Sequence, residues 1–130
     1  MWKELLYVAV GAGLGGVLRF LCTQGITYMM SSPSYWATLT VNTVGCFLIA
    51  LLVTGGSHTL SLSTSARLFL IVGFCGGFTT FSSYINDFFT LYHSGKASLG
   101  IFYLLVSVLS GVIAFIAGSL LALELWKEKL

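Results

Sequence analysis

The residues best suited to chemistry lie in one run, from Gly73 to Tyr84, with the sequence GFCGGFTTFSSY. Two adjacent glycines weaken a helix, and the hydroxyl groups that follow can satisfy backbone groups that a break would free. Freed carbonyl oxygens at such a break can coordinate a small cation. Phe81 and Tyr84 share one helical face, and their partly positive ring edges could stabilise an anion if they faced a cavity. Simple packing of the two rings is the alternative interpretation.

A second polar group, Thr38, Asn42 and Gly45, recurs at helical spacing within an apolar stretch. Asn42 would lie near the middle of a membrane span. A neutral amide at that depth can join helices by hydrogen bonding, and spacing alone favours this structural role. The alternative is that the NH2 group of Asn42 donates a hydrogen bond to an anion.

Arg19 is the one basic residue that falls well inside an apolar stretch near the N-terminus. Gly11 and Gly15 form a GxxxG pair, which lets another backbone approach closely, and Arg19 continues that face four residues later. An arginine at this depth is costly unless it reaches the interface or meets partners in protein or a water-filled cavity. Arg19 is therefore either an anchor at the end of a helix or an anion-attracting charge at a wet vestibule.

A row of small and hydroxyl-bearing residues follows later in the chain. Tyr103, Ser107 and Gly111 are spaced four residues apart, so a helix would place them on one face. Such a row is either a seam of small residues for packing or a line of hydroxyl donors beside the helix that carries the 73–84 run.

The composition shows which solvent these elements must face. Hydrophobic residues make up 57% of the 130 residues and charged residues only 8%, with a formal net charge of +2. A soluble domain usually carries about 25% charged residues. The composition excludes a cytosolic enzyme and a disordered chain, and the small, scattered charge excludes a nucleic-acid binder. The sequence predicts an all-α integral membrane protein, surrounded by the lipid bilayer.

Gaps between charged residues locate the spans. No Asp, Glu, Lys or Arg occurs in 20–57, 68–86 or 97–123, and a spanning helix needs about 20 mostly apolar residues. The first gap is too long for one span and contains the only proline, within Ser31-Ser32-Pro33-Ser34. We predict four transmembrane helices over 5–30, 35–54, 66–92 and 98–125, with a polar loop over 55–65. The third helix is predicted to break at mid-membrane, and 1–130 forms a single four-span domain.

The sequence also lacks the motifs of several other functions. It has no Walker loop, no HExxH and no Cys/His cluster, so we predict that the protein is not an enzyme. No acidic residue lies in the middle of a predicted span, which disfavours proton coupling. An even number of spans places Lys3, Arg67, Lys127 and Lys129 on one side, and the positive-inside rule assigns that side to the cytoplasm. This bias is small, so insertion in both orientations stays open.

Three motifs together resemble one known family. They are Gly11-x-Gly13-x-Gly15-Gly16-x-Leu18-Arg19-Phe20, Thr38-Leu39-x-Val41-Asn42-x-x-Gly45 and Gly73-x-Cys75-Gly76-Gly77-x-Thr79-Thr80-Phe81-Ser82. Their order and spacing, and the four-span length, are similar to the Fluc/CrcB fluoride channels over nearly the whole chain. The resemblance implies a passive, fluoride-selective channel of the cell (plasma or inner) membrane. Such a channel exports cytoplasmic fluoride down its electrochemical gradient and thereby detoxifies it.

The resemblance also implies an assembly and a set of site residues. It implies an antiparallel, dual-topology dimer with two pores and a structural Na+ held by the backbone carbonyls of Gly76 and Thr79. The residues that it implies along the fluoride path are Asn42 and Phe81, with Tyr84, Thr38, Tyr103 and Ser107 as further candidates, and Arg19 in a vestibule. Two departures from the family pattern stand out: Tyr84 replaces a second phenylalanine, and Gly111 replaces a common serine. Because some members pair distinct subunits, the partner is either a second copy or a related second subunit.

Two other functions are alternatives to a channel. A small multidrug-type proton-coupled exporter shares four short helices, but it needs a membrane-buried Glu in the first helix, and 5–18 contains none. A non-transporting membrane subunit would use the glycine seams for assembly alone. That hypothesis leaves Asn42 and the predicted break without a task.

Overall fold

In the computed structural model the chain is described over residues 1–31, 33–58 and 62–126. Every regular element in these ranges is helical. In chain order they are α1 (Trp2–Met30), α2 (Ser34–His58), α3 (Thr64–Arg67), the π-helix η1 (Leu68–Cys75), α4 (Gly76–Phe78), α5 (Phe81–His93) and α6 (Ala97–Leu125).

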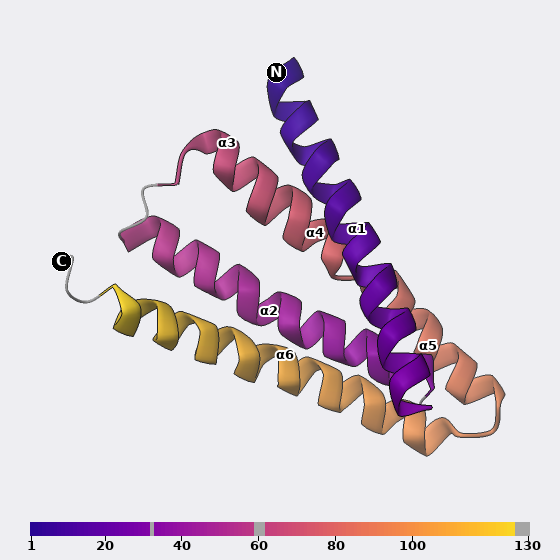
Figure 1. Ribbon diagram of the computed structural model, residues 1–130. Coiled ribbons are helices and arrows are strands. Elements are labelled where there is room, and N and C mark those ends of the chain that lie inside the picture. Colours follow the sequence, from indigo (N-terminus) through magenta and orange to yellow (C-terminus); the bar gives the residue numbers. More distant parts are fainter. Residues whose placement is uncertain (32, 59–61, 127–130) are drawn as a thin grey trace.

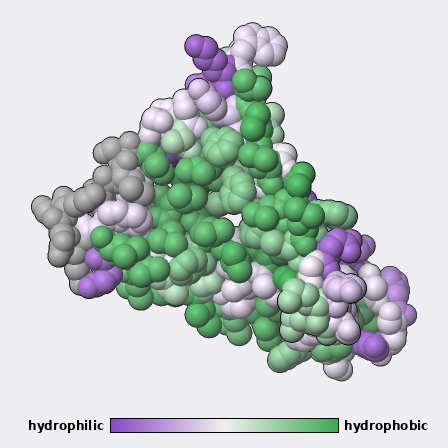
Figure 2. Space-filling view, in the orientation of Figure 1, coloured by the Kyte–Doolittle hydropathy of each residue, from purple (hydrophilic) through white to green (hydrophobic). Residues whose placement is uncertain are grey.

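Four stretches of these helices are long and apolar enough to cross a membrane. They are Trp2–Met30, Ser34–Gly56, Thr64–His93 and Ala97–Leu125. Figure 2 shows hydrophobic residues over the middle of the molecule and hydrophilic residues at its extremities. The sequence prediction of an all-α, four-span membrane protein is therefore confirmed.

α2 and α6 lie side by side along most of their length (Figure 1). Hydroxyl groups join the two helices, since Thr43 and Ser110 share a hydrogen bond of 2.9 Å and Thr54 donates to Ser119 at 3.3 Å. Gly118 lets the α2 backbone approach, because a Cβ at this position would lie 2.5 Å from the carbonyl oxygen of Phe47. The packing of α2 against α6 holds the α6 face that carries Ser107 against α2.

α1 packs against the first half of the third span through glycines on both sides. A Cβ at Gly15 would collide with the carbonyl oxygen of Phe74, and a Cβ at Gly77 would collide with the carbonyl oxygen of Ala12. Gly11 and Gly73 make similarly close approaches to the opposite backbone. The GxxxG face of α1 thus meets a matching Gly73–Gly77 face, which allows two backbones to touch without side chains between them.

The third span changes its winding several times. It begins with α3, continues as η1 and α4, and is interrupted before α5 by two extended residues, Thr79 (φ −83°, ψ 161°) and Thr80 (φ −151°, ψ 116°). Gly76 itself is helical, with φ −63° and ψ −36°. The two threonines, and not the Gly76-Gly77 pair, carry the change of direction, because hydrogen bonds described below hold Thr80 out of the helix.

The predicted loop over 55–65 is partly wrong. α2 continues through Gly55 and Gly56 as far as His58, and a Cβ at Gly55 would lie 2.6 Å from the ring of Trp126 at the end of α6. The ring leaves no room for a side chain at position 55, which accounts for a glycine at this point of the helix. Residues 59–61, like Lys127 and Lys129, lie outside the described residues, and Ser63 caps α3 by accepting from Ala66 N at 3.2 Å.

Candidate functional site

The side chain of Asn42 pairs with the interrupted backbone of the third span. Its Nδ2 donates to the Thr80 carbonyl oxygen at 3.0 Å, and its Oδ1 accepts from the Thr80 N–H at 2.8 Å. A primary amide carries two N–H donors, so one N–H of Asn42 is left after these bonds. The same residue therefore joins α2 to the third span and keeps a donor for another acceptor.

Two helix ends of opposite polarity meet at the extended residues. α4 ends at Phe78, where backbone carbonyls carry partial negative charge, and α5 begins at Phe81, where backbone N–H groups carry partial positive charge. Thr80 caps α5, since its Oγ1 accepts from Ser83 N at 3.2 Å, and Thr79 Oγ1 donates to the Cys75 carbonyl oxygen at 3.0 Å. The interruption thus presents a cation-attracting end and an anion-attracting end a few residues apart.

A groove of about 540 Å³ opens beside this interruption, between α2 and the third span. Its polar and small lining residues are Asn42, Gly45, Gly76, Thr79 and Thr80, and Phe81 lies at the same groove. A Cβ at Gly76 would meet nothing within 4 Å. Thr79 is held against α2, because a Cβ at Gly45 would collide with its methyl group.

A second cavity, of about 240 Å³, also borders Thr80. Arg19 and Thr23 of α1 line it together with Thr38, Thr80 and Ser83. The Nε of Arg19 is buried and has no hydrogen-bond partner among the described residues. Arg19 therefore lies beside a cavity with hydroxyl groups, and Thr80 lines both this cavity and the groove.

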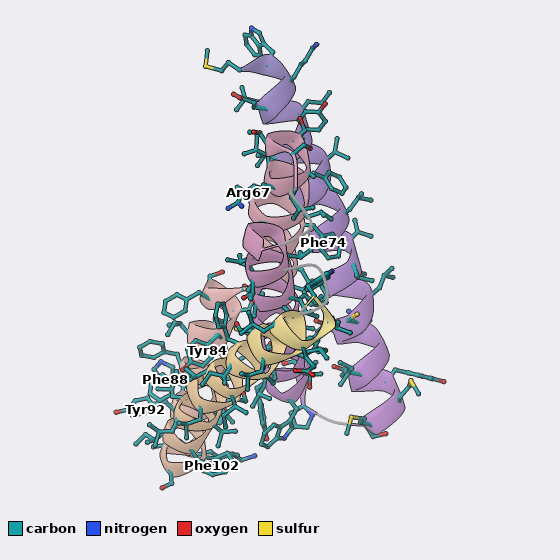
Figure 3. The ribbon with its side chains drawn as sticks, turned by 90° about the vertical axis from the view of Figure 1, so that its left-hand side faces the viewer. Arg67, Phe74, Tyr84, Phe88, Tyr92 and Phe102 are labelled. Atoms are coloured by element: carbon teal, nitrogen blue, oxygen red, sulfur yellow. The ribbon has the colours of Figure 1, made fainter. Side chains whose placement is uncertain are left out.

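The two aromatic residues of the 73–84 run differ in their surroundings. Phe81 is 74% exposed, whereas Tyr84 is 8% exposed, and their ring centroids are 5.7 Å apart. The Tyr84 hydroxyl donates to the Leu104 carbonyl oxygen of α6 at 2.9 Å. Tyr84, Phe88 and Tyr92 follow one another along α5 at a spacing of four residues (Figure 3). Phe81 is thus an exposed ring, whereas Tyr84 is a ring fixed against α6.

Tyr103 is fully buried next to Tyr84, with ring centroids 5.5 Å apart. Its hydroxyl donates to Asp87 Oδ2 at 3.3 Å. Ser107, one turn further along α6, has a buried Oγ without a hydrogen-bond partner among the described residues. Neither Tyr103 nor Ser107 is among the residues that line the two cavities described above.

The structure thus brings together some of the predicted site residues and separates others. Asn42, Gly76, Thr79 and Phe81 share the groove, and Arg19 and Thr38 share the second cavity. Thr80, which lines both cavities, was expected only to satisfy freed backbone groups, and Thr23, one turn after Arg19, was not predicted as a site residue. A signal existed for Thr80, since it directly follows Thr79 in the predicted break.

These features define a class: a polytopic α-helical membrane protein whose third span is interrupted between a groove and an arginine-lined cavity. A family model described as "CrcB-like protein, Camphor Resistance (CrcB)" matches residues 6–119. The chain belongs to this family, and the resemblance stated from the motifs is confirmed.

Several relatives match over most of their length, each with the name "Fluoride-specific ion channel FluC". The Bacteroides fragilis protein is 40% identical over 122 residues, which are 92% of this chain and 95% of the relative. The Agrobacterium fabrum protein is 42% identical over 125 residues, or 95% of this chain and 98% of the relative. The Azobacteroides pseudotrichonymphae protein is 36% identical over 121 residues, or 93% of this chain and 97% of the relative.

Proposed function

We propose that this protein is a passive fluoride channel that exports cytoplasmic fluoride through the cell membrane. The observation that carries the proposal is the match to relatives with this name over more than nine-tenths of the chain, at 36–42% identity. A channel needs no chemical reaction, and the protein is not an enzyme. The multidrug-type exporter is not favoured, because Glu4 in the first turn is the one acidic residue of α1.

The groups around the interruption suit a small, strongly hydrated anion. A conducting site must replace water yet bind weakly enough to release the ion. The remaining N–H of Asn42 and the ring edge of Phe81 are uncharged partners of this kind, and Arg19 would draw anions into the second cavity. Ser107, whose Oγ has no partner among the described residues, would extend the proposed path with a hydroxyl donor. Thr38 and Tyr103 are further candidates, whose hydroxyls would have to leave Ser34 and Asp87 to donate to the ion. Tyr84 would offer its ring edge, because its hydroxyl donates to Leu104.

We assign the groove to a second subunit in antiparallel orientation. Non-helical backbone within a membrane must be covered by protein or line a water-filled cavity, and the groove leaves Thr79 and Thr80 beside open space. A second chain in this groove would cover them and bring a second interruption close to the first. The partner is either another copy of this chain or a related subunit.

The backbone at the interruption also suits a structural Na+. Within the described residues no three His, Cys, Asp or Glu side chains are placed to hold a metal, so carbonyl oxygens are the ligands available here. The carbonyls of Gly76 and Thr79, next to the C-terminal end of α4, would hold the ion, and the partner would add the corresponding pair. When bound, Na+ supplies a fixed positive charge that offsets repulsion between anions without standing in their path.

Fluoride efflux from proteoliposomes, followed with a fluoride-selective electrode, tests the proposal. The purified chain is reconstituted alone, and we expect fluoride to leave much faster than from protein-free vesicles, with no added ATP. Chloride efflux from the same vesicles serves as the selectivity control. Efflux at the protein-free rate, from vesicles that contain a folded dimer, would contradict the channel assignment. Efflux that requires a related second chain would identify a heterodimer.

A further inference from the structure

The amide of Asn42 and the carbonyl of Gly76 are linked through one backbone N–H group. We infer that Asn42 is a positioning residue for the Na+ site, because its Oδ1 takes the Thr80 N–H that a continuous helix would give to Gly76. The inference rests on the proposed function in one respect, namely that Gly76 and Thr79 hold Na+. It adds a role for Asn42 that is separate from donation to fluoride.

The hydrogen bonds along the third span locate where the helix ladder stops. In an α-helix each N–H donates to the carbonyl four residues earlier. Thr79 N still follows this rule, since it donates to the Cys75 carbonyl oxygen at 3.1 Å. Thr80 N would donate to Gly76 next, but it donates to Asn42 Oδ1 at 2.8 Å instead. The Gly76 carbonyl therefore lacks the donor that a continued α-helix would supply.

The second bond of Asn42 holds the new backbone direction. Its Nδ2 donates to the carbonyl oxygen of Thr80 at 3.0 Å. Both backbone polar groups of Thr80 are therefore bound to the Asn42 side chain. Thr80 is extended, with φ −151° and ψ 116°, and Thr79 has ψ 161°. The peptide group that carries the Thr79 carbonyl lies between the ψ torsion of Thr79 and the φ torsion of Thr80. Fixing Thr80 therefore also fixes the direction of this carbonyl, the second proposed Na+ ligand.

The neighbouring hydroxyl groups do not replace this function. Thr79 Oγ1 donates to Cys75, and Thr80 Oγ1 accepts from Ser83 N and donates to Ser83 Oγ at 3.0 Å. Each of these bonds completes a helix end on its own side of the interruption. Gly76 borders the groove, and Thr80 N is bound to Asn42, so the Gly76 carbonyl is left to an ion or to a partner chain.

Two substitutions separate the acceptor function of Asn42 from its donor function. Asn42→Asp keeps an oxygen that accepts from Thr80 N, but it removes the N–H donors and adds negative charge. Asn42→Leu has a similar size and removes the acceptor as well. Thr40→Val is the matched control, because the Thr40 hydroxyl is exposed and bonds to Trp36 of its own helix at 2.9 Å.

The readout is the melting temperature of the purified dimer in detergent as Na+ replaces N-methylglucamine, alongside fluoride efflux. Binding to the folded state alone raises the melting temperature by about 5 °C or more when the ligand reaches roughly a hundred times its dissociation constant. We expect the full rise for the unaltered protein and Thr40→Val, and no rise for Asn42→Leu. Asn42→Asp keeps the acceptor for Thr80 N but loses the bond to the Thr80 carbonyl, so we expect a smaller rise for it. Efflux should be lost in both Asn42 variants and kept in Thr40→Val.

A full Na+ effect in Asn42→Leu would overturn the inference, and so would the absence of an effect in the unaltered protein. If Asn42→Leu does not fold, the test passes to Asn42→Asp, in which loss of the Na+ effect from folded protein would overturn it. Failure of the proposed function looks different: the unaltered protein would then show no fluoride efflux, whatever the Na+ series shows.

Discussion

The two sides of the third span are built for different neighbours. Towards α1 the backbones touch, since a Cβ at Gly77 would collide with the carbonyl of Ala12. On the groove side, a Cβ at the adjacent Gly76 would meet nothing within 4 Å beyond the backbone of its own helix. Two consecutive glycines thus serve unlike purposes: the fold of this chain requires Gly77, whereas nothing in the described residues requires Gly76.

The same contrast continues past the interruption. Phe81 is exposed beside the groove, while Tyr84, three residues later, is enclosed against α6 and bonded to Leu104. Residues on the packed side should therefore control whether the chain folds. Residues on the groove side should control pairing and conduction while leaving the single chain intact.

The largest effect is expected from Gly77→Ala. Its new methyl group meets a backbone carbonyl, which cannot rotate away as a side chain would, so α1 and the third span must separate. Overpacking costs about 1–3 kcal/mol and more where backbone moves, so we expect a melting temperature lower by about 10 °C, or no folded protein. Gly13→Ala is the control, because Gly13 is exposed with open space at Cβ. A normal melting temperature for Gly77→Ala would contradict the backbone contact.

Gly76→Ala sharpens the comparison on the other side of the span. The single chain has room for the methyl group, so helix content by circular dichroism should not change. If a partner chain and an ion fill the groove, pairing and efflux should weaken, by about tenfold for a cost of ~1.4 kcal/mol. Analytical ultracentrifugation in detergent and the efflux assay measure the two quantities. Unchanged dimerisation and efflux would show that the space at Gly76 stays empty.

Phe81→Leu tests the exposed ring. Leucine preserves apolar bulk but has no ring edge, and the 74% exposure of Phe81 means that little packing is lost within the chain. A favourable aromatic contact is worth about 0.5–1.5 kcal/mol, so we expect efflux to fall by up to about tenfold with the melting temperature nearly unchanged. A large loss of stability with normal specific efflux would instead assign Phe81 to packing.

The spans could be predicted from the sequence because lipid imposes a simple requirement on length and charge. The expected 5–30 and 98–125 correspond to Trp2–Met30 and Ala97–Leu125, within a few residues at each end. The second helix was predicted too short, because its extension through Gly55 depends on Trp126, which lies about 70 residues later. Local glycine content alone could not reveal that contact.

The site was predictable by residue type but not by geometry. Asn42 and the 73–84 run were singled out, yet the sequence pointed to the glycines as the weak point of the helix. The extended residues are Thr79 and Thr80, because the amide of Asn42, 38 positions away, takes both backbone groups of Thr80. The π-helical winding of Leu68–Cys75 likewise has no signature in the sequence.

The smallest effect is expected from Tyr84→Phe, which removes the hydroxyl that distinguishes the enclosed ring from the exposed one. Its bond to the Leu104 carbonyl is worth about 0.5–1.5 kcal/mol, so the melting temperature should fall by a few degrees. Efflux should stay within about threefold, because a hydroxyl already bonded to α6 is not the group that meets the ion. Tyr92→Phe, on the exposed part of the same helix, controls for general effects of losing a hydroxyl. Abolished efflux in a stable Tyr84→Phe protein would mean that the hydroxyl leaves Leu104 during conduction, and the division between a packed side and a conducting side would then not extend to this residue.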